Sequence, residues 1–316
     1  MALTARSLRT RAPSAAAMLA VAALLLGACG DDDGGGDAGG FVEARRVPAQ
    51  HAAGLAAAPD GTLVVGELMT GEVSEIDPVT GESTPRGTVE PLETTPTQRG
   101  LLGLAVTDDG EVLAGFVNGD DRIEVAALDA DGSRDRRWLG PSAQNQANGG
   151  RLALLPDDRV VIGIGDLLDP DLIDDPDAPN GKLLDITDGG DGKVIAGSFN
   201  NPFALTAADD GTLWVADNAP GAQPERLMRV GTDGEVETLA QWDETRVPVG
   251  AAVLDDGRLA LCNYATTELR LVDPDDPGDG KGELLADDCR YAVIALPDGG
   301  VAYAAEEEVV VLTPEA

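Results

Sequence analysis

Oxygen ligands for a hard cation are concentrated in one loop of this sequence. Residues 165–177 hold six aspartates in thirteen positions. Calcium binds in proteins through clustered carboxylate and carbonyl oxygens, so this composition predicts a calcium-binding loop. The alternative is a solvated surface loop, because the segment lacks the glycine and the terminal glutamate of an EF-hand and is interrupted by prolines. The sequence leaves both interpretations open.

Proton transfer is the second chemistry to consider, and the chain offers one imidazole for it. His51 is the only histidine among 316 residues. Histidine is the side chain best suited to accept a proton near neutral pH. His51 precedes an apolar run that we expect to be an inner strand, which makes it a candidate catalytic base. A rim histidine with no chemical role is the alternative, and Asp166 of the acidic loop is a second candidate base.

Cations are scarce in this chain. It has 22 Lys and Arg against 57 Asp and Glu, a formal net charge of −35. Such a surface repels nucleic acid and anionic membranes, so we expect no nucleic-acid partner. Four arginines nonetheless fall in loops that we expect on one rim of the fold. They predict either an anionic ligand there or local pairing with carboxylates: Arg99, Arg151, Arg246 and Arg290.

The elements that must position these residues recur six times. In each, an apolar run meets a turn built on Asp, usually Asp-Gly, and a second apolar run follows. Asp-Gly suits a tight turn because both residues tolerate positive φ. The turns recur every 42 to 53 residues, the period of four-stranded sheets arranged radially. We therefore predict an all-β, six-bladed β-propeller, with units at 54–65, 101–114, 152–164, 203–215, 249–261 and 292–304.

The two ends of the propeller are predicted to meet in one blade. The last unit runs out of chain after its third strand, 308–312, whereas residues 41–47 alternate like a strand and have no unit of their own. We expect this segment to supply the outer strand of blade six, because closing the ring removes two exposed sheet edges. The propeller then spans residues 41–316 as one domain without helices.

The first 40 residues are predicted to lie outside the propeller. Three arginines precede a twelve-residue apolar segment, 15–26, which is too short to span a bilayer and is typical of an export signal. It leads into Leu26-Gly27-Ala28-Cys29, which resembles the bacterial lipobox. We predict a signal peptide over 1–28, a lipid anchor on Cys29 and a Gly/Asp-rich tether over 29–40, which together hold the protein on the outer side of the cell membrane. A plain secretion signal with an incidental cysteine is the alternative.

Two cysteines remain within the predicted propeller. Outside the cytoplasm an even pair indicates a disulfide. Cys262 ends the second strand of blade five and Cys289 immediately precedes the first strand of blade six, so both fall on the same rim. We predict a disulfide between them; two separately buried thiols are the alternative.

An ordered set of short motifs resembles one protein family. The set covers about residues 98–218, and its order on a six-fold repeat is more specific than any single motif. The motifs are Gln98-Arg99-Gly100-Leu101-Leu102-Gly103-Leu104-Ala105, Asn148-Gly149-Gly150-Arg151-Leu152, Gly163-Ile164-Gly165-Asp166, Asn180-Gly181-Lys182-Leu183-Leu184-Asp185-Ile186, and Asn201-Pro202 with Leu213-Trp214-Val215-Ala216-Asp217. They resemble the glucose/sorbosone dehydrogenase family, soluble quinoproteins that oxidise sugars with pyrroloquinoline quinone (PQQ) and calcium.

The resemblance implies a site, and the sequence departs from it. The family's base, a His directly before Asn-Gly-Gly-Arg, corresponds to Ala147, which cannot accept a proton. General-base assistance commonly contributes about 10²–10⁴-fold in rate. The family's Arg before Asn-Pro corresponds to Asn200, and Arg290 lies between two positions, 289 and 291, where the family has arginines. The implied cofactor contacts are Gln98, Asn148, Arg151, Asn200 and Arg290, and the implied calcium ligands are Asp217, Ala219, Pro220 and Glu225.

Three functions are consistent with these residues. We favour a membrane-tethered, monomeric propeller that resembles this family, has lost the catalytic His and binds a small molecule or a protein partner in the channel mouth. The alternative is a PQQ-dependent aldose dehydrogenase with an altered site, which a quinone absorption band would distinguish. A third is a metal-dependent hydrolase of the lactonase type, in which Glu67, Asn201 and Asp217 would converge on one divalent ion.

Overall fold

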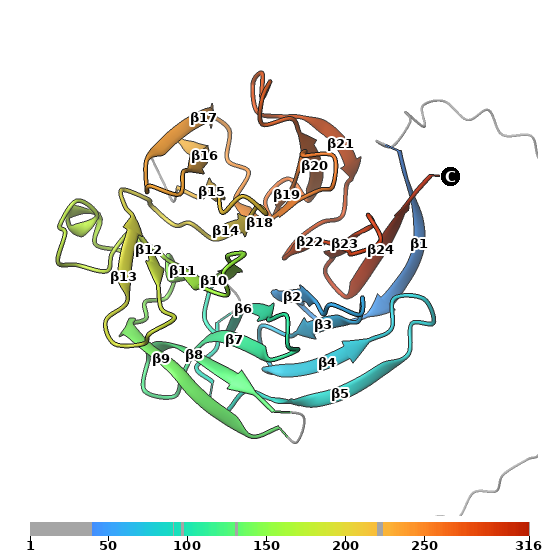
Figure 1. The fold of residues 1–316 in the computed structure, drawn as a ribbon, viewed down its shortest axis with the longest axis horizontal. Coiled ribbons are helices and arrows are strands. Elements are labelled where there is room, and N and C mark those ends of the chain that lie inside the picture. The colour runs from blue at the N-terminus through green and yellow to red at the C-terminus, as the bar shows by residue number, and fades with distance from the viewer. Residues whose placement is uncertain (1–39, 91, 96–97, 130–131, 220–223, 316) are drawn as a thin grey trace, which may run out of the picture. The chain divides into compact units, whose positions relative to one another are not determined.

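Six four-stranded antiparallel sheets form the part of the chain that the structure describes. The computed structural model describes residues 40–90, 92–95, 98–129, 132–219 and 224–315. Figure 1 shows the sheets arranged radially, with the first strand of each nearest the centre. The predicted all-β, six-bladed propeller is therefore confirmed. Blades one to three consist of β2 (Gly54–Ala57), β3 (Leu63–Gly66), β4 (Glu72–Ile76) and β5 (Ser83–Thr88); β6 (Leu101–Val106), β7 (Val112–Val117), β8 (Arg122–Leu128) and β9 (Arg134–Ser142); and β10 (Gly149–Leu154), β11 (Val160–Ile164), β12 (Lys182–Asp185) and β13 (Lys193–Ala196).

The remaining three blades include the one that joins the two ends of the propeller. Their strands are β14 (Ala204–Ala207), β15 (Leu213–Asp217), β16 (Glu225–Val230) and β17 (Val236–Trp242); β18 (Pro248–Val253), β19 (Leu259–Asn263), β20 (Glu268–Val272) and β21 (Glu283–Ala286); and β22 (Val293–Ala295), β23 (Val301–Ala304), β24 (Glu308–Pro314) and β1 (Phe41–Pro48). β1 pairs antiparallel with β24, from Phe41 opposite Pro314 to Pro48 opposite Glu308. The prediction that the N-terminal segment supplies the outer strand of blade six is confirmed.

The hairpin turn between the first two strands has the same form in every blade. In blade one, Gly61 N donates to Ala58 O and Ala58 N donates to Thr62 O, which is a turn followed by a one-residue bulge. Gly61 takes a positive φ of 88°, whereas Asp60 does not. Asp60 acts through its side chain instead, whose Oδ1 accepts from Thr62 N at 3.0 Å.

Apolar side chains hold neighbouring blades together. One buried cluster joins β2 and β3 to β6 and β7, and others join blade three to blade four, blade four to blade five, and blade six to blade one. The inner strands carry small and branched side chains, which suits sheets buried on both faces. The contact between blades one and two is so close that a Cβ on Gly54 would lie 2.5 Å from Leu101 Cδ2. This packing fixes the ends of the inner strands, where the mouth of the central channel forms.

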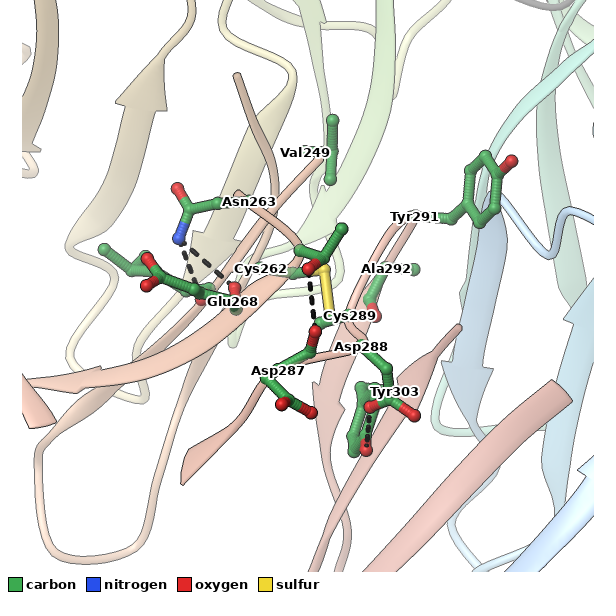
Figure 2. Close-up of a disulfide and its surroundings, with 12 residues drawn as sticks. Val249, Cys262, Asn263, Glu268, Asp287, Asp288, Cys289, Tyr291, Ala292 and Tyr303 are labelled. Atoms are coloured by element: carbon green, nitrogen blue, oxygen red, sulfur yellow. Dashed lines mark hydrogen bonds between the residues drawn. A yellow bond between two sulfur atoms is a disulfide. The ribbon is translucent and has the colours of Figure 1, made fainter. Parts of the chain in front are cut away.

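Two further elements bear on the site. The only helix among the described residues is the short 3-10 helix η1 (Pro170–Leu172), within the acidic loop of blade three, so the expectation of no helix needs this small correction. No described helix has the length and hydrophobicity needed to cross a membrane. The predicted disulfide is confirmed: Cys262 of β19 is bonded to Cys289, their Cα atoms are 5.6 Å apart and both side chains are fully buried (Figure 2).

Candidate functional site

A cavity of about 250 Å³ lies at the mouth of the central channel, where loops of all six blades meet. Ala53 and Leu68 belong to blade one, Gln98 precedes β6 of blade two, and Arg290 precedes β22 of blade six. We call it the mouth cavity. Its lining consists of Ala53, Leu68, Gln98, Gln146, Ala147, Asn201, Phe203, Asn218, Ala219, Thr245, Val247, Val249, Tyr264, Arg290 and Tyr291.

The charge of the mouth cavity differs from that of the chain. No carboxylate lines it among the described residues, although the chain has 57 acidic residues, and Arg290 is its one charged lining residue. Arg290 Cζ lies 5.3 Å from the centroid of the Tyr264 ring, and its Nε lies 3.2 Å from Glu306 Oε2. A site of this composition attracts an apolar or anionic ligand rather than a cation.

A small polar network fixes Arg290 at the rim. Glu306 Oε1 accepts from the Tyr291 hydroxyl at 3.1 Å and lies 3.2 Å from His51 Nε2. The ring of His51 packs edge-on against Tyr291, with centroids 5.6 Å apart. Burial raises the pKa of Tyr291, so this phenol stays protonated and donates to Glu306. His51 itself does not line the mouth cavity, and its role as a base stays a prediction.

Amide side chains form the polar part of the wall. Gln98 Oε1 accepts from Asn148 N and from Asn201 Nδ2, at 3.2 and 3.3 Å, and Asn201 Oδ1 accepts from Gly149 N at 3.0 Å. Asn218 is 8% exposed and lines the cavity, yet its side-chain amide meets no hydrogen-bond partner in the described part of the chain. The Asn218 amide is open to the mouth cavity, where it can form hydrogen bonds to a ligand.

Ala147 is the position at which the sequence resemblance implied a catalytic base. It is 2% exposed, lines the mouth cavity and adopts a φ of 58°. Its carbonyl accepts from Leu167 N at 3.1 Å, which holds this strained backbone in place. No imidazole or carboxylate is present in the described lining of the cavity.

Arg151 closes the channel beneath the mouth cavity instead of lining it. The side chain is buried, and its guanidinium donates to main-chain carbonyls of four other blades: Nε to Phe203 O at 3.2 Å, Nη2 to Val249 O at 2.7 Å, and further bonds to Ala53 O and Tyr291 O. No carboxylate pairs with it among the described residues, and burial lowers its pKa to about 9. Arg151 therefore ties the inner strands together, and its predicted contact with a cofactor stays a prediction.

The carboxylates predicted to bind calcium are occupied by the protein. Asp217 is fully buried and accepts from Asn201 N at 2.8 Å, from Asn200 N and Nδ2, and from Arg226. Glu225 accepts from Arg246 N at 2.7 Å and from Val247 N, which shapes the loop before β18. Of the other two positions, Ala219 lines the mouth cavity and Pro220 lies outside the described residues.

No metal centre is assembled in the part of the chain described here. Groups of three or more His, Cys, Asp or Glu side chains suited to a metal are absent from it. Asp166 Oδ1 accepts from Leu168 N at 2.9 Å, and Asp174 accepts from the Ser198 hydroxyl, so these loop carboxylates stabilise turns. Glu67, proposed for a hydrolase site, accepts from Gln50 N and Thr70 and does not line the cavity. These contacts favour the solvated-loop interpretation of residues 165–177.

Of the other residues predicted to contact a cofactor, some line the mouth cavity and others stabilise the loops around it. Asn148 is fully buried and donates to the carbonyls of Gln98 and Gln144 through Nδ2, and Asn200 donates to Asp217, so both amides serve the loops. Gln98 and Arg290 do line the mouth cavity. Of the rim arginines, Arg99 pairs with Asp121, Arg246 with Glu244 and Arg290 with Glu306, as the carboxylate-pairing alternative expected.

Comparison with known proteins adds the fold relationship. No protein-family model matches the chain, and neither does any curated protein sequence. Among solved structures, the PQQ-bound aldose sugar dehydrogenase from Streptomyces coelicolor is 21% identical, with a TM-score of 0.70 over 86% of this chain and 97% of that one. The soluble aldose sugar dehydrogenase from Escherichia coli, in its apo form, is 14% identical, with a TM-score of 0.69 over 87% and 99%.

A propeller of another activity is similar but less so. Virginiamycin B lyase from Staphylococcus aureus is 15% identical, with a TM-score of 0.54 over 86% of this chain and 99% of that one. At such identities a likeness carries the fold and not the chemistry. The chain has the six-bladed propeller fold of the soluble aldose sugar dehydrogenases.

Proposed function

We propose that this chain is a binding propeller that holds a small organic molecule in the mouth cavity and does not oxidise sugars. The observation that carries the proposal is the composition of the cavity: among the described residues, its lining is mainly apolar with several uncharged polar side chains and one arginine, and Ala147 stands where a proton acceptor would be needed. Without a base, the general-base contribution of about 10²–10⁴-fold is lost. The protein acts as a monomer, and its charge of −35 keeps nucleic acid away.

PQQ fits this cavity poorly. It is a fused-ring quinone with several carboxylates, whereas the mouth cavity has a volume of about 250 Å³ and, among the residues described, one lining cation, which already lies beside Glu306. Pockets for drug-sized ligands start at about 300 Å³. Calcium fits no better, because Asp217 and Glu225 accept hydrogen bonds from the protein itself. We derive no reaction through either group.

The alternative function is a PQQ-dependent aldose dehydrogenase, favoured by the fold likeness to the PQQ-bound enzyme from Streptomyces coelicolor. Titration of the purified chain with PQQ and calcium tests the two functions against each other, with cofactor absorbance, thermal stability and dye-linked oxidation of aldoses as readouts. We expect no saturable binding at high micromolar PQQ and no dye reduction. Saturable binding followed by reduction with a sugar would establish the dehydrogenase instead.

We also propose that the protein is exported and anchored by lipid on Cys29, facing outward from a bacterial cell membrane. The support is the order of an apolar segment, Leu26-Gly27-Ala28-Cys29 and a Gly/Asp-rich stretch. In a bacterial host, the unchanged chain should fractionate with membranes and the Cys29→Ser variant should not. A variant that stays with the membranes after carbonate washing would contradict the anchor.

A further inference from the structure

Aromatic rings are concentrated in the mouth cavity far beyond their share of the chain. The chain has ten Phe, Tyr and Trp residues among 316, and three of the fifteen lining residues are Phe203, Tyr264 and Tyr291. The rings of Tyr264 and Tyr291 lie 6.0 Å apart at 63°, so they form one continuous wall. Aromatic walls favour a flat, aromatic ligand through stacked and edge-to-face contacts.

Three of the polar side chains that line the cavity come from alternate blades. Gln98 belongs to blade two, Asn218 to blade four and Arg290 to blade six. Gln98 and Asn218 are each 8% exposed, and no described residue accepts a hydrogen bond from either side-chain nitrogen. The terminal nitrogens of Arg290 likewise form no hydrogen bond to a described residue, and its Nε lies 3.2 Å from Glu306 Oε2. All three side chains have N–H groups to donate, so the ligand must carry oxygen acceptors.

Charge and size limit the ligand further. One guanidinium, which lies beside Glu306, can neutralise at most one carboxylate of a ligand, and a second negative charge would face a protein of net charge −35 without a partner. A volume of about 250 Å³ holds a single ring more readily than a fused system.

We propose that the ligand of the mouth cavity is a one-ring aromatic monocarboxylate with a further oxygen acceptor on the ring. Its carboxylate meets Arg290, its ring lies against Tyr264 and Tyr291, and its other oxygen accepts from the Asn218 amide. This assignment rests on the proposed binding function of the same cavity. The assignment depends on the aromatic rings and on the three side chains that can donate hydrogen bonds. Each of these side chains can be removed by a separate substitution.

The test is calorimetric titration of the full chain with 4-hydroxybenzoate as the probe. Three comparison compounds separate the features: trans-4-hydroxycyclohexanecarboxylate lacks only the aromatic ring, 4-hydroxybenzyl alcohol lacks the charge, and benzene-1,3,5-tricarboxylate carries two further carboxylates in place of the hydroxyl. We expect 4-hydroxybenzoate to bind about tenfold or more tightly than each of them. Equal or tighter binding of the tricarboxylate, or of the saturated ring, would overturn the assignment.

Variants link the binding to the named residues. Arg290→Gln and Asn218→Leu should each weaken the binding of 4-hydroxybenzoate by about tenfold, because the first removes the positive charge beside the carboxylate and the second removes the amide donor. Arg229→Gln is the matched control, since Arg229 pairs with Glu237 on an exposed strand face and should leave the affinity unchanged. Tyr264→Leu keeps an apolar side chain but removes the ring. It should therefore reduce the ratio of the affinity for 4-hydroxybenzoate to the affinity for the saturated-ring carboxylate.

The outcomes distinguish this assignment from the proposed function. If no aromatic carboxylate binds and PQQ does not bind, this ligand class is wrong while the absence of sugar oxidation still stands. If aldoses reduce the dye in the presence of PQQ, the proposed function fails, and the ligand assignment fails with it. Binding of 4-hydroxybenzoate that is unaffected in Arg290→Gln and Asn218→Leu places the probe elsewhere and overturns the assignment.

Discussion

Glu306 controls how strongly Arg290 can attract an anion. Its two oxygens contact Arg290, Tyr291 and His51, and the side chain is half exposed. Glu306→Gln removes a negative charge next to the guanidinium while keeping one acceptor oxygen. Because exposed ion pairs contribute about 0.2–1 kcal/mol, we expect the affinity for 4-hydroxybenzoate to rise by about 1.4- to fivefold. Calorimetric titration at low and high salt measures this, with Glu237→Gln as the control; unchanged or weaker binding in Glu306→Gln contradicts it.

Arg151 is the residue on which closure of the channel depends. Its guanidinium satisfies carbonyls of four blades, and the Arg151→Met variant would leave them without donors in a buried place. A buried polar group left unpaired costs about 1–3 kcal/mol, so we expect a loss of about 3 kcal/mol or more in the free energy of unfolding. Urea unfolding measures it.

A matched variant separates this effect from the loss of any buried arginine. Arg246 is also buried, but its side chain pairs with the exposed Glu244 and stacks on Trp242. Arg246→Met should therefore destabilise less than Arg151→Met. If both variants lose the same free energy of unfolding, the hydrogen bonds of Arg151 to the carbonyls contribute no more to stability than the contacts of another buried arginine.

At the scale of elements, the disulfide joins β19 to the segment that carries Arg290 and Tyr291. Cys262 and Cys289 are 27 residues apart in sequence, and closing a loop of that length contributes about 3.5 kcal/mol by the chain-entropy relation. The double variant Cys262→Ala, Cys289→Ala should lose about that much stability in urea and should bind 4-hydroxybenzoate more weakly. Both sulfurs are fully buried, so dithiothreitol should have no effect until the chain unfolds. Rapid loss of stability on adding reductant to the native protein would contradict this.

β1 closes the ring, and its removal should expose β24. Seven residue pairs join the two strands, and Phe41 and Val47 are buried there. A chain starting at residue 49 leaves β24 as an unpaired edge, which is a template for pairing with another molecule. We expect this variant to unfold at a lower temperature and to form dimers or larger species in size-exclusion chromatography. A chain starting at residue 40 is the control and should remain monomeric.

Local patterns explain what the sequence could predict about the fold. The six hairpins depend on turn chemistry within a few residues, and even Asp158, where the glycine is missing, takes the positive φ that Gly61 takes elsewhere. The pairing of β1 with β24 follows from an edge that has to be closed. Such features need no knowledge of distant contacts, so blade number, ring closure and the disulfide were all predictable.

The lining of the mouth cavity depends on loop geometry that a sequence does not display. Gln98, Arg290 and Ala219 line it, whereas the Asn148 amide donates to the Gln98 and Gln144 carbonyls and the Asn200 amide donates to Asp217. Asn218 and Phe203 were not singled out, although each directly follows a residue that was, Asp217 and Pro202. Whether an amide faces the cavity or the backbone is decided by hydrogen bonds between blades, and no motif encodes them.

For the whole molecule, the excess of acid over base predicts how stability responds to pH. Burial raises the pKa of Glu225 and of Asp166, so folding favours their protonated forms. The folded state therefore binds more protons than the unfolded state as the pH falls through these pKa values, which lie above the ordinary 4.5 and 3.8. Repulsion among the 57 acidic residues also weakens as the pH falls, because carboxylates become protonated and lose their charge. We expect the melting temperature to rise as the pH is lowered from 8 towards about 5.

The turn aspartates limit how far the stability can increase as the pH falls. The salt dependence of the melting temperature separates the buried carboxyls from surface repulsion as causes of the increase. Asp60 and Asp210 accept backbone hydrogen bonds that lower their pKa, so their stabilisation is present above pH 3.8 and is lost below it. Melting curves from pH 3 to 8 should therefore pass through a maximum. In 1 M NaCl the screening length is about 3 Å, which suppresses surface repulsion but not the burial of Glu225 and Asp166. If the melting temperature still rises towards pH 5 in 1 M NaCl, the buried carboxyls cause the rise. If the rise disappears in 1 M NaCl, surface repulsion causes it. A melting temperature that does not rise at either salt concentration contradicts both explanations.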